Sequence, residues 1–290
     1  TLLPYIPPKI WQIFISSDDS DSSIPINLPI YVPKWLSLHP SFAYTIIDNS
    51  GALAIVSRLQ QFLSTSRQRR DCEAKMLHSI DMPLEFTPLY EQISRPVMRA
   101  DFMRYAILAL EGGVYSDSDT YPLFPLRDWV PQGLRNNVRL IVGIEADSQP
   151  PVPGTTYPVQ FAQWTIAGAK GHPIFWRMIR RVLVEVQKRT KGDDIRAIDG
   201  KQKVLSFTNN DILRISGPAG WTEELFEYMS TVTATEVTWR NLTGLTDPVL
   251  FGDVLVLPID GFATGVPHSG ASLENGNATM VRHQFSGSWK

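Results

Sequence analysis

The chain has 290 residues, 43% of them hydrophobic and 10% aromatic, so it can bury a large core. Its 27 basic and 29 acidic residues give a formal net charge of −2, which excludes a global positive field that would attract nucleic acid or an anionic membrane surface. The single cysteine, Cys72, excludes an internal disulfide framework and a cysteine-based zinc cluster. No apolar run approaches the ~20 residues that a membrane-spanning helix needs.

Strand and helix patterns alternate along the chain, which is typical of an α/β sheet. An apolar, β-prone segment at 8–15 predicts a buried first strand, and a polar loop follows at 16–23. Pro96 opens the clearest helix, which runs from Val97 to about Leu110 and ends before two glycines. The other predicted elements are helices at 33–38, 52–63 and 174–188, and strands at 42–47, 114–116, 140–144 and 163–167. We expect the C-terminal third to mix short strands with glycine and proline turns, and no linker divides the predicted single domain, 1–290.

The sharpest chemical feature is the tripeptide Asp-Ser-Asp at 117–119, directly after the predicted strand 114–116. Two carboxylates at i and i+2 of an extended backbone point the same way and can share a hard divalent cation. The carboxyl end of a strand is also where ligands bind in open α/β sheets. The same tripeptide at 19–21 lies in a serine-rich loop, where a solvated turn explains it. The context therefore favours Asp117 and Asp119 as a metal site.

Two charged residues on the preceding predicted helix lie near this pair. Asp101 and Arg104 are three positions apart and so share one face of the helix. A surface ion pair would also explain them, but the helix leads directly to Asp117, and a role in binding a donor stays open. Arg99 is the alternative residue for contact with phosphate.

The C-terminal segment 283–290 has small residues and a terminal Trp-Lys pair, which suggests a loop that folds over a ligand. Its first residue, His283, supplies an imidazole, and imidazole with carboxylates is a reasonable ligand set for manganese. A structural role for this histidine is equally open. Signatures of Rossmann dehydrogenases, P-loop proteins and α/β-hydrolases are absent from the sequence. A metal aided by Lys290 or an arginine would then neutralise the charge of a leaving diphosphate.

The series of motifs resembles glycosyltransferase family 32, and within it the fungal Golgi α-1,6-mannosyltransferases of N-glycan outer chains. The motifs that carry the resemblance lie at 8–12, 99–105, 112–119, 163–166, 171–173, 216–222 and 283–290. Several separated motifs in the right order are more specific than any one of them. The resemblance runs from about residue 8 to the end of the chain.

The resemblance implies an α/β GT-A fold with a mixed sheet flanked by helices. It also implies transfer of mannose from GDP-mannose to an oligomannose N-glycan, with retention of configuration and an α-1,6 linkage. Manganese is the expected cofactor and magnesium the alternative. The implied location is the Golgi lumen, with a type II membrane anchor upstream of the chain, and assembly with other Golgi mannosyltransferases is a further expectation.

The resemblance also implies roles for individual residues. Asp117 and Asp119 would hold the metal and the diphosphate, and His283 would complete the metal site. The expected donor-binding residues are Trp11, Arg99, Asp101, Arg104, Gly217, Pro218, Ser288, Trp289 and Lys290. No carboxylate nucleophile stands out, so front-face departure is favoured, with the leaving phosphate helping to deprotonate the acceptor. Glu145 and Asp147, after the strand 140–144, are the predicted contacts of the acceptor hydroxyl, with loop capping as the alternative.

Two other functions are compatible with these motifs. The first is a family 32 transferase that uses another donor, or a lipid or different glycan as acceptor. The second is a non-catalytic sugar-binding module of the same fold. Two sequons, at Asn241 and Asn277, weakly favour passage through the secretory pathway.

Overall fold

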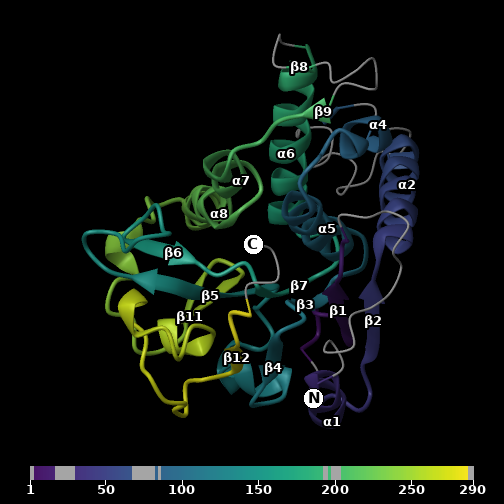
Figure 1. The fold of residues 1–290 in the computed structure, drawn as a ribbon. Coiled ribbons are helices and arrows are strands. Elements are labelled where there is room, and N and C mark those ends of the chain that lie inside the picture. Colours follow the sequence, from purple (N-terminus) through teal and green to yellow (C-terminus); the bar gives the residue numbers. More distant parts are fainter. Residues whose placement is uncertain are drawn as a thin grey trace.

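The computed structural model describes residues 3–16, 30–66, 82–83, 86–191, 195–196 and 204–286. An eight-stranded sheet runs through the molecule in the order β10-β11-β5-β7-β3-β1-β2, and β6 pairs with β5 outside this path (Figure 1). Its strands are β1 (Lys9–Ile13), β2 (Ala43–Ile47), β3 (Gly113–Ser116), β5 (Leu140–Asp147), β6 (Val159–Phe161), β7 (Thr165–Gly168), β10 (Val249–Phe251) and β11 (Val254–Leu257).

The sheet is mixed. β1 pairs in parallel with β2 and β3, and β11 pairs in parallel with β5, whereas β7 lies antiparallel to both β3 and β5. Because β3 and β5 are both antiparallel to β7, they are parallel to each other, and their carboxyl ends meet at one edge of the sheet. The predicted α/β class with a mixed sheet flanked by helices, expected of a GT-A fold, is confirmed.

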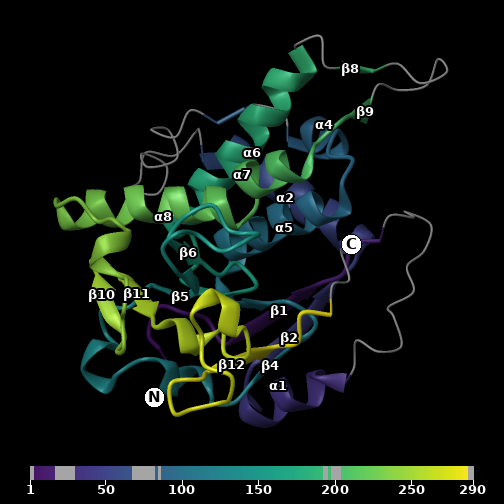
Figure 2. The same ribbon diagram turned by 60° about the vertical axis from the view of Figure 1, so that its left-hand side comes forward.

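Most of the helices cover one face of the sheet, and the first helix with irregular segments covers the other (Figure 2). The helices are α1 (Val32–Leu38), α2 (Asn49–Ser66), α4 (Phe86–Glu91), α5 (Pro96–Glu111), α6 (Pro173–Lys191), α7 (Asn209–Ile215) and α8 (Pro218–Thr233), with 3-10 turns at Leu126–Trp129, Gln132–Leu134, Trp239–Asn241, Ile259–Gly261 and Pro267–Ser269. The main core packs α2, α4, α5, α6 and α8 against the sheet. A second core on the opposite face includes Trp35 of α1, Trp129 and Phe262. None of the described helices is long and apolar enough to cross a membrane.

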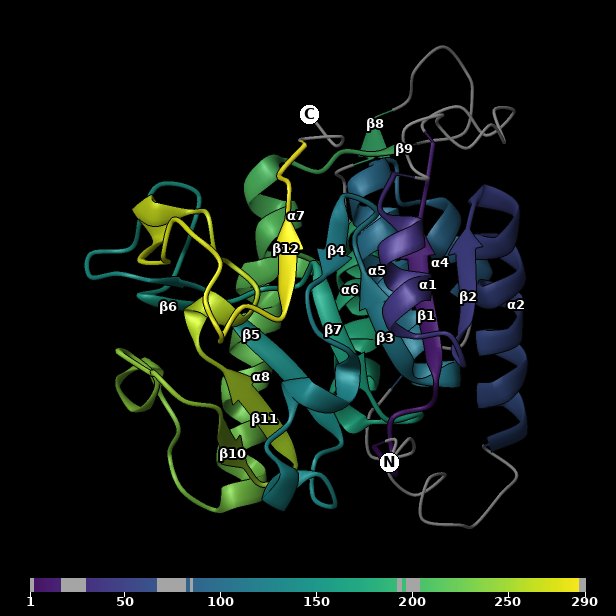
Figure 3. The same cartoon turned by 90° about the horizontal axis from the view of Figure 1, so that it is seen from below.

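A two-stranded ribbon of β4 (Thr120–Pro122) and β12 (Val281–His283) lies beside this sheet. Figure 3 shows the two strands next to each other, and the ribbon joins residues just after Asp119 to the end of the described chain. A smaller pair, β8 (Ile195–Arg196) and β9 (Val204–Leu205), lies against the helix that follows β7, and Oγ of Ser94 donates to the carbonyl of Leu205. The ribbon of β4 and β12 therefore brings the C-terminal segment to the carboxyl end of β3.

The prediction for the C-terminal third was wrong in one respect, because this part contains the 16-residue helix α8 and the shorter α7. The glycines and the proline at 216–220 indicated a turn. In the structure Gly217 is the N-cap of α8 and Pro218 occupies its first turn, where a missing N–H costs nothing and the fixed φ suits the helix. The turn signal therefore marks the start of a helix.

Candidate active site

The predicted site residues gather at the carboxyl edge of the sheet. Asp117 follows β3, and Glu145 and Asp147 lie at the end of β5. Since β3 and β5 are parallel, these carboxylates come to the same edge. This is the edge where ligands bind in open α/β sheets.

Asp117, Asp119 and His283 form a cluster. One carboxylate oxygen of each aspartate and one ring nitrogen of His283 all lie within 4.8 Å of one another. The pairing of β12 with β4 sets His283 opposite Thr120, one residue after Asp119. Two carboxylates with one imidazole suit a divalent ion such as manganese. The structure thus brings together the three predicted metal ligands, although it does not show which ion they bind.

Asp119 is held by the C-terminal segment. Nε2 of His283 lies 3.0 Å from its Oδ1, and the backbone N–H of Ser286 donates to its Oδ2 at 2.8 Å. Burial raises the pKa of the Asp119 carboxyl, but His283 and the Ser286 amide outweigh it, and the net pKa is lowered. The His283 ring also contacts Trp164, with 4.9 Å between ring centroids. Asp119 therefore stays ionised and oriented for a cation.

Asp117 is held by residues whose roles the sequence did not reveal. The hydroxyl of Tyr115 donates to its Oδ1, and Nε2 of Gln12 donates to its backbone carbonyl at 3.0 Å. Its own backbone N–H donates to the carbonyl of Trp164 at 2.7 Å. All three residues stand inside the recognised motifs, but their residue types alone indicate no function. Their contacts fix the loop that carries the two aspartates.

Asp101 and Arg104 form a buried ion pair, which rules out the surface alternative. Nη2 of Arg104 lies 3.0 Å from Oδ1 of Asp101, and the side chains are 6% and 1% exposed, respectively. The same Nη2 lies 3.7 Å from Oδ1 of Asp117. Burial raises the pKa of Asp101, and the charge of Arg104 offsets part of this rise. The pair therefore links α5 to the first metal ligand.

The second carboxylate oxygen of Asp101 connects this pair to the segment before α8. Oγ of Ser216 donates to Oδ2 of Asp101 at 2.8 Å, and Nε2 of Gln163 donates to Oδ1 at 3.1 Å. The predicted donor loop, Gly217 and Pro218, comes directly after this serine. A Cβ on Gly217 would lie 2.8 Å from Cα of Leu213, so the close backbone approach requires glycine.

Other predicted residues have different surroundings. Nε of Arg99 donates to the carbonyl of Ile93 at 2.6 Å. The indole of Trp11 donates to the carbonyl of Gly112 at 2.8 Å, at the amino end of β3 and thus away from Asp117. The structure does not show either residue among the clustered ligands, and their donor roles stay predictions. Ser288, Trp289, Lys290, Cys72 and the tripeptide 19–21 lie outside the described residues.

The two carboxylates of β5 differ in their contacts. Asp147 accepts from Oγ1 of Thr243 at 2.8 Å and from the backbone N–H of Gly244 at 2.6 Å, so it holds a loop. Glu145 is partly buried and accepts one hydrogen bond, from Nε2 of Gln160 at 2.9 Å. Burial raises the pKa of Glu145 to about 7, although Gln160 and the charge of His283 both lower it. Glu145 therefore combines a raised pKa with an electrostatic interaction with His283 of the metal cluster.

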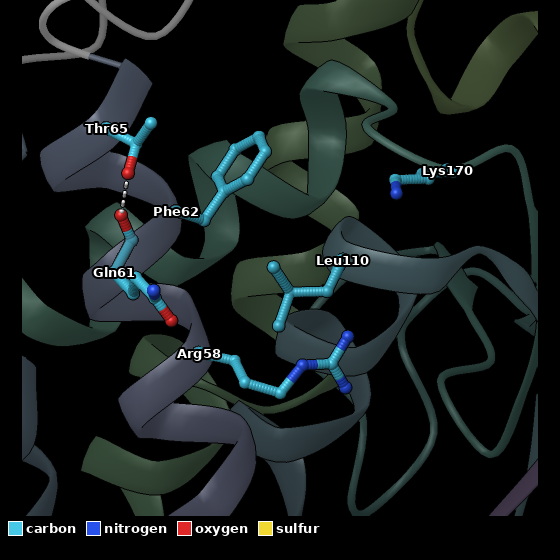
Figure 4. Close-up of a pocket in the computed structure, with 6 residues that line it drawn as sticks. All are labelled: Arg58, Gln61, Phe62, Thr65, Leu110 and Lys170. Carbon is cyan, nitrogen blue, oxygen red and sulfur yellow. Dashed lines mark hydrogen bonds between the residues drawn. The ribbon is translucent and has the colours of Figure 1, made fainter.

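A separate hollow of about 290 Å³ lies at the other end of α5. Figure 4 shows Phe62 and Arg58 of α2 reaching toward Leu110 of α5, with Lys170 on the loop after β7. Leu110 lies just before the amino end of β3, so the hollow is at the opposite edge from Asp117. The Arg58 guanidinium is paired with Glu111. We assign no role in catalysis to this hollow.

Comparisons with known proteins agree with this geometry. Residues 27–135 match the family described as "Glycosyltransferase sugar-binding region containing DXD motif", a span that includes Asp117 and Asp119. The chain is 35% identical, over 99% of its length, to the initiation-specific alpha-1,6-mannosyltransferase of Schizosaccharomyces pombe, and covers 65% of that protein. The proteins of the same name from Candida albicans and Saccharomyces cerevisiae are 28% and 22% identical over 98% of this chain, which covers 72% and 78% of them.

The chain is thus similar over nearly all of its length to fungal mannosyltransferases and contains the DXD region of a glycosyltransferase family. This similarity favours an enzyme over the non-catalytic sugar-binding module that the motifs left open. Its DXD motif is the Asp117–Asp119 pair, since these aspartates lie in the matched region and cluster with His283. The chain spans just under two thirds of the length of its S. pombe relative.

Proposed function

We propose that this glycosyltransferase transfers mannose from GDP-mannose to an oligomannose N-glycan, with retention of configuration and formation of an α-1,6 linkage. The cluster of Asp117, Asp119 and His283 carries the proposal, because it can hold the cation that a nucleotide-diphosphate donor needs. The names of the fungal relatives support the choice of sugar and linkage.

Manganese is the proposed ion, with magnesium as the alternative. Asp117, Asp119 and His283 would hold it, and it would supply charge neutralisation to the leaving diphosphate. The lowered pKa of Asp119 keeps this ligand ionised at neutral pH. Tyr115 and Gln12 hold Asp117 in place, so the protein orients the carboxylates before the donor binds.

Donor recognition would depend on the buried network behind the metal site. Arg104 carries a positive charge 3.7 Å from Asp117 and is fixed by Asp101, so it can contact the sugar or ribose of the donor. The Gly217-Pro218 loop adjoins this pair through Ser216. Trp11, Arg99 and the C-terminal Ser288, Trp289 and Lys290 complete the proposed donor set.

We place the acceptor at Glu145 and Asp147, on the side of β5. The sugar bond would break on the face where the acceptor enters, which gives retention without a covalent enzyme intermediate. A Golgi-lumenal location, a type II anchor upstream of the chain, an N-linked glycoprotein acceptor and assembly with other Golgi mannosyltransferases belong to the same proposal.

The test measures release of GDP from GDP-mannose, with manganese present or chelated, with and without an oligomannose N-glycan. Acceptor-stimulated, chelator-sensitive release is expected, and linkage analysis of the product should give α-1,6. Turnover of UDP-sugars in place of GDP-mannose would show that the proposed donor is wrong. An α-1,2 or α-1,3 product would overturn the linkage alone.

A further inference from the structure

Glu145 lies at an irregularity in β5. Ile144 pairs with Phe161 and Ala146 with Gln160, and the register shifts between these two pairs. Glu145 is therefore an extra residue between them. Such bulges re-aim a side chain, and they are common beside active sites. Ile144 and Ala146 are each 1% exposed, whereas Glu145 between them is partly exposed.

Gln160 fixes one side of this carboxylate. The side-chain carbonyl of Gln160 accepts from the backbone N–H of Thr156 at 2.9 Å, which settles the orientation of its amide. Nε2 of Gln160 must then face Glu145, and it donates to Oε2 at 2.9 Å. Gln160 itself is fully buried. Among the described residues nothing donates to Oε1 of Glu145. One oxygen is thus held by the protein and the other is left for a ligand.

Glu145 interacts electrostatically with His283 of the metal cluster. The charge of His283 lowers the pKa of Glu145. Burial raises its pKa to about 7, despite the hydrogen bond from Gln160. A carboxylate with a pKa near neutrality can accept a proton during a reaction and release it afterwards. Asp147, two residues further on, has both oxygens occupied by the Thr243-Gly244 loop.

The geometry points to Glu145 as the catalytic residue that binds the attacking hydroxyl of the acceptor and takes its proton, with Gln160 as the residue that positions it. This inference rests on the proposed function. The acceptor oxygen forms a bond to the anomeric carbon as the bond from that carbon to the diphosphate oxygen breaks. The electron pair of the broken bond leaves with the diphosphate. The proton passes to Oε1 of Glu145, a role that the sequence resemblance gave to the leaving phosphate, and then to solvent.

The experiment compares Glu145→Gln, Glu145→Asp and Gln160→Met with the wild-type enzyme. Glu236→Gln is the matched control, since Glu236 is exposed after the far end of α8. The readouts are kcat and KM for acceptor-dependent GDP release, and the affinity for GDP in the presence of manganese. We expect Glu145→Gln to lower kcat ~10²–10³-fold, as for loss of a general base, with GDP affinity unchanged. Glu145→Asp should lower kcat ~10-fold, because the carboxylate is kept but its side chain is shorter by one methylene.

Gln160→Met separates positioning from simple folding support. Loss of its hydrogen bond to Glu145 should lower kcat, leave KM for GDP-mannose unchanged, and move the acidic limb of the kcat pH profile to higher pH. This direction follows because the Gln160 amide holds the pKa of Glu145 down. A purely structural role would leave the pH profile in place.

Three results would overturn the inference. The first is a Glu145→Gln enzyme that keeps more than ~10% of wild-type kcat, since a lost general base costs at least ~10²-fold. The second is a parallel loss of GDP affinity, which would place Glu145 in the donor site. The third is an unmoved pH profile in Gln160→Met. If the wild-type enzyme uses another nucleotide sugar, the proposed donor is wrong, but the kcat ratios of the variants to wild type, measured with that sugar, still decide the role of Glu145. If the wild-type enzyme turns over no nucleotide sugar, the proposed function and the inference on Glu145 are both wrong.

Discussion

Nε2 of His283 lies 3.0 Å from Oδ1 of Asp119, although 164 positions separate the two residues in the chain. The β4–β12 ribbon makes this approach by pairing His283 with Thr120. The C-terminal segment therefore completes a site whose other ligands follow β3. Asp119 therefore joins the proposed metal site to the C-terminal segment through its contacts with His283 and Ser286.

His283→Ala should raise the manganese concentration required for half-maximal activity by at least ~10-fold, because even outer-shell partners of a metal contribute this much. Manganese titration of GDP release measures the effect. His268→Ala is the control, since His268 is exposed and outside the cluster. An unchanged manganese requirement in His283→Ala would remove His283 from the metal site.

Replacement of Asp117 and Asp119 together by alanine should abolish manganese-dependent transfer while the fold survives. Both side chains lie at the sheet edge, outside the apolar cores. Circular dichroism and thermal unfolding check the fold, and product analysis checks transfer. Mannose transfer by the double variant would show that the site assignment is wrong.

Tyr115→Phe should weaken manganese binding while leaving its three ligands intact. The lost hydroxyl donates to Oδ1 of Asp117, and a hydrogen bond to a charged group contributes about 1.5–3 kcal/mol. We expect the manganese requirement to rise by ~10-fold or more, since 1.4 kcal/mol is tenfold in affinity. Tyr157→Phe is a matched control, because Tyr157 donates to the carboxylate of Glu223 on α8. Equal manganese curves for both variants would contradict the positioning role of Tyr115.

Asp101→Ala should destabilise the protein by about 3–5 kcal/mol, because it leaves Arg104 buried without its partner. Urea unfolding measures the free energy. Asp128→Ala breaks the exposed pair with Arg127 and should cost less than ~1 kcal/mol. Similar losses of the free energy of unfolding in the two variants would mean that water solvates the Arg104 guanidinium once Asp101 is removed.

The pH dependence of stability tests the state of Glu145. Its folded pKa of about 7 lies above the model-peptide value of 4.5. The folded state therefore binds the proton more tightly, and the resulting stability is present below about pH 4.5 and lost as pH rises through about 7. The Glu145→Gln variant has no carboxyl group to titrate at this position, so it does not lose stability in this way. Its free energy of unfolding relative to wild type should rise across this window, by about 3 kcal/mol. A difference independent of pH would contradict the raised pKa.

The longer strands and helices up to α6 followed from hydrophobic periodicity and from proline and glycine signals, whereas the short α4, β4 and β6 were not predicted. The strong periodicity of α5, opened by Pro96 and ended at Gly112, was sufficient to place it almost to the residue. Helix α8 was missed because glycine and proline give the same signal in a turn and in the first turn of a helix. Only packing of α8 against α6 and β6 decides between these outcomes.

The sequence by itself indicated the pair of aspartates that we propose as metal ligands. Asp117 and Asp119 are neighbours along the chain, and the apolar strand before them sets their direction. It also indicated Asp101 and Arg104, since helical spacing puts them on one face. The resemblance predicted His283 beside the two aspartates, and the structure supplied its contact with Asp119. Two contacts between distant segments were decided only by the tertiary structure: Ser216 at Asp101, and Gln160 at the Glu145 bulge. Local spacing carries no information on strand register, and register is what brings these side chains together.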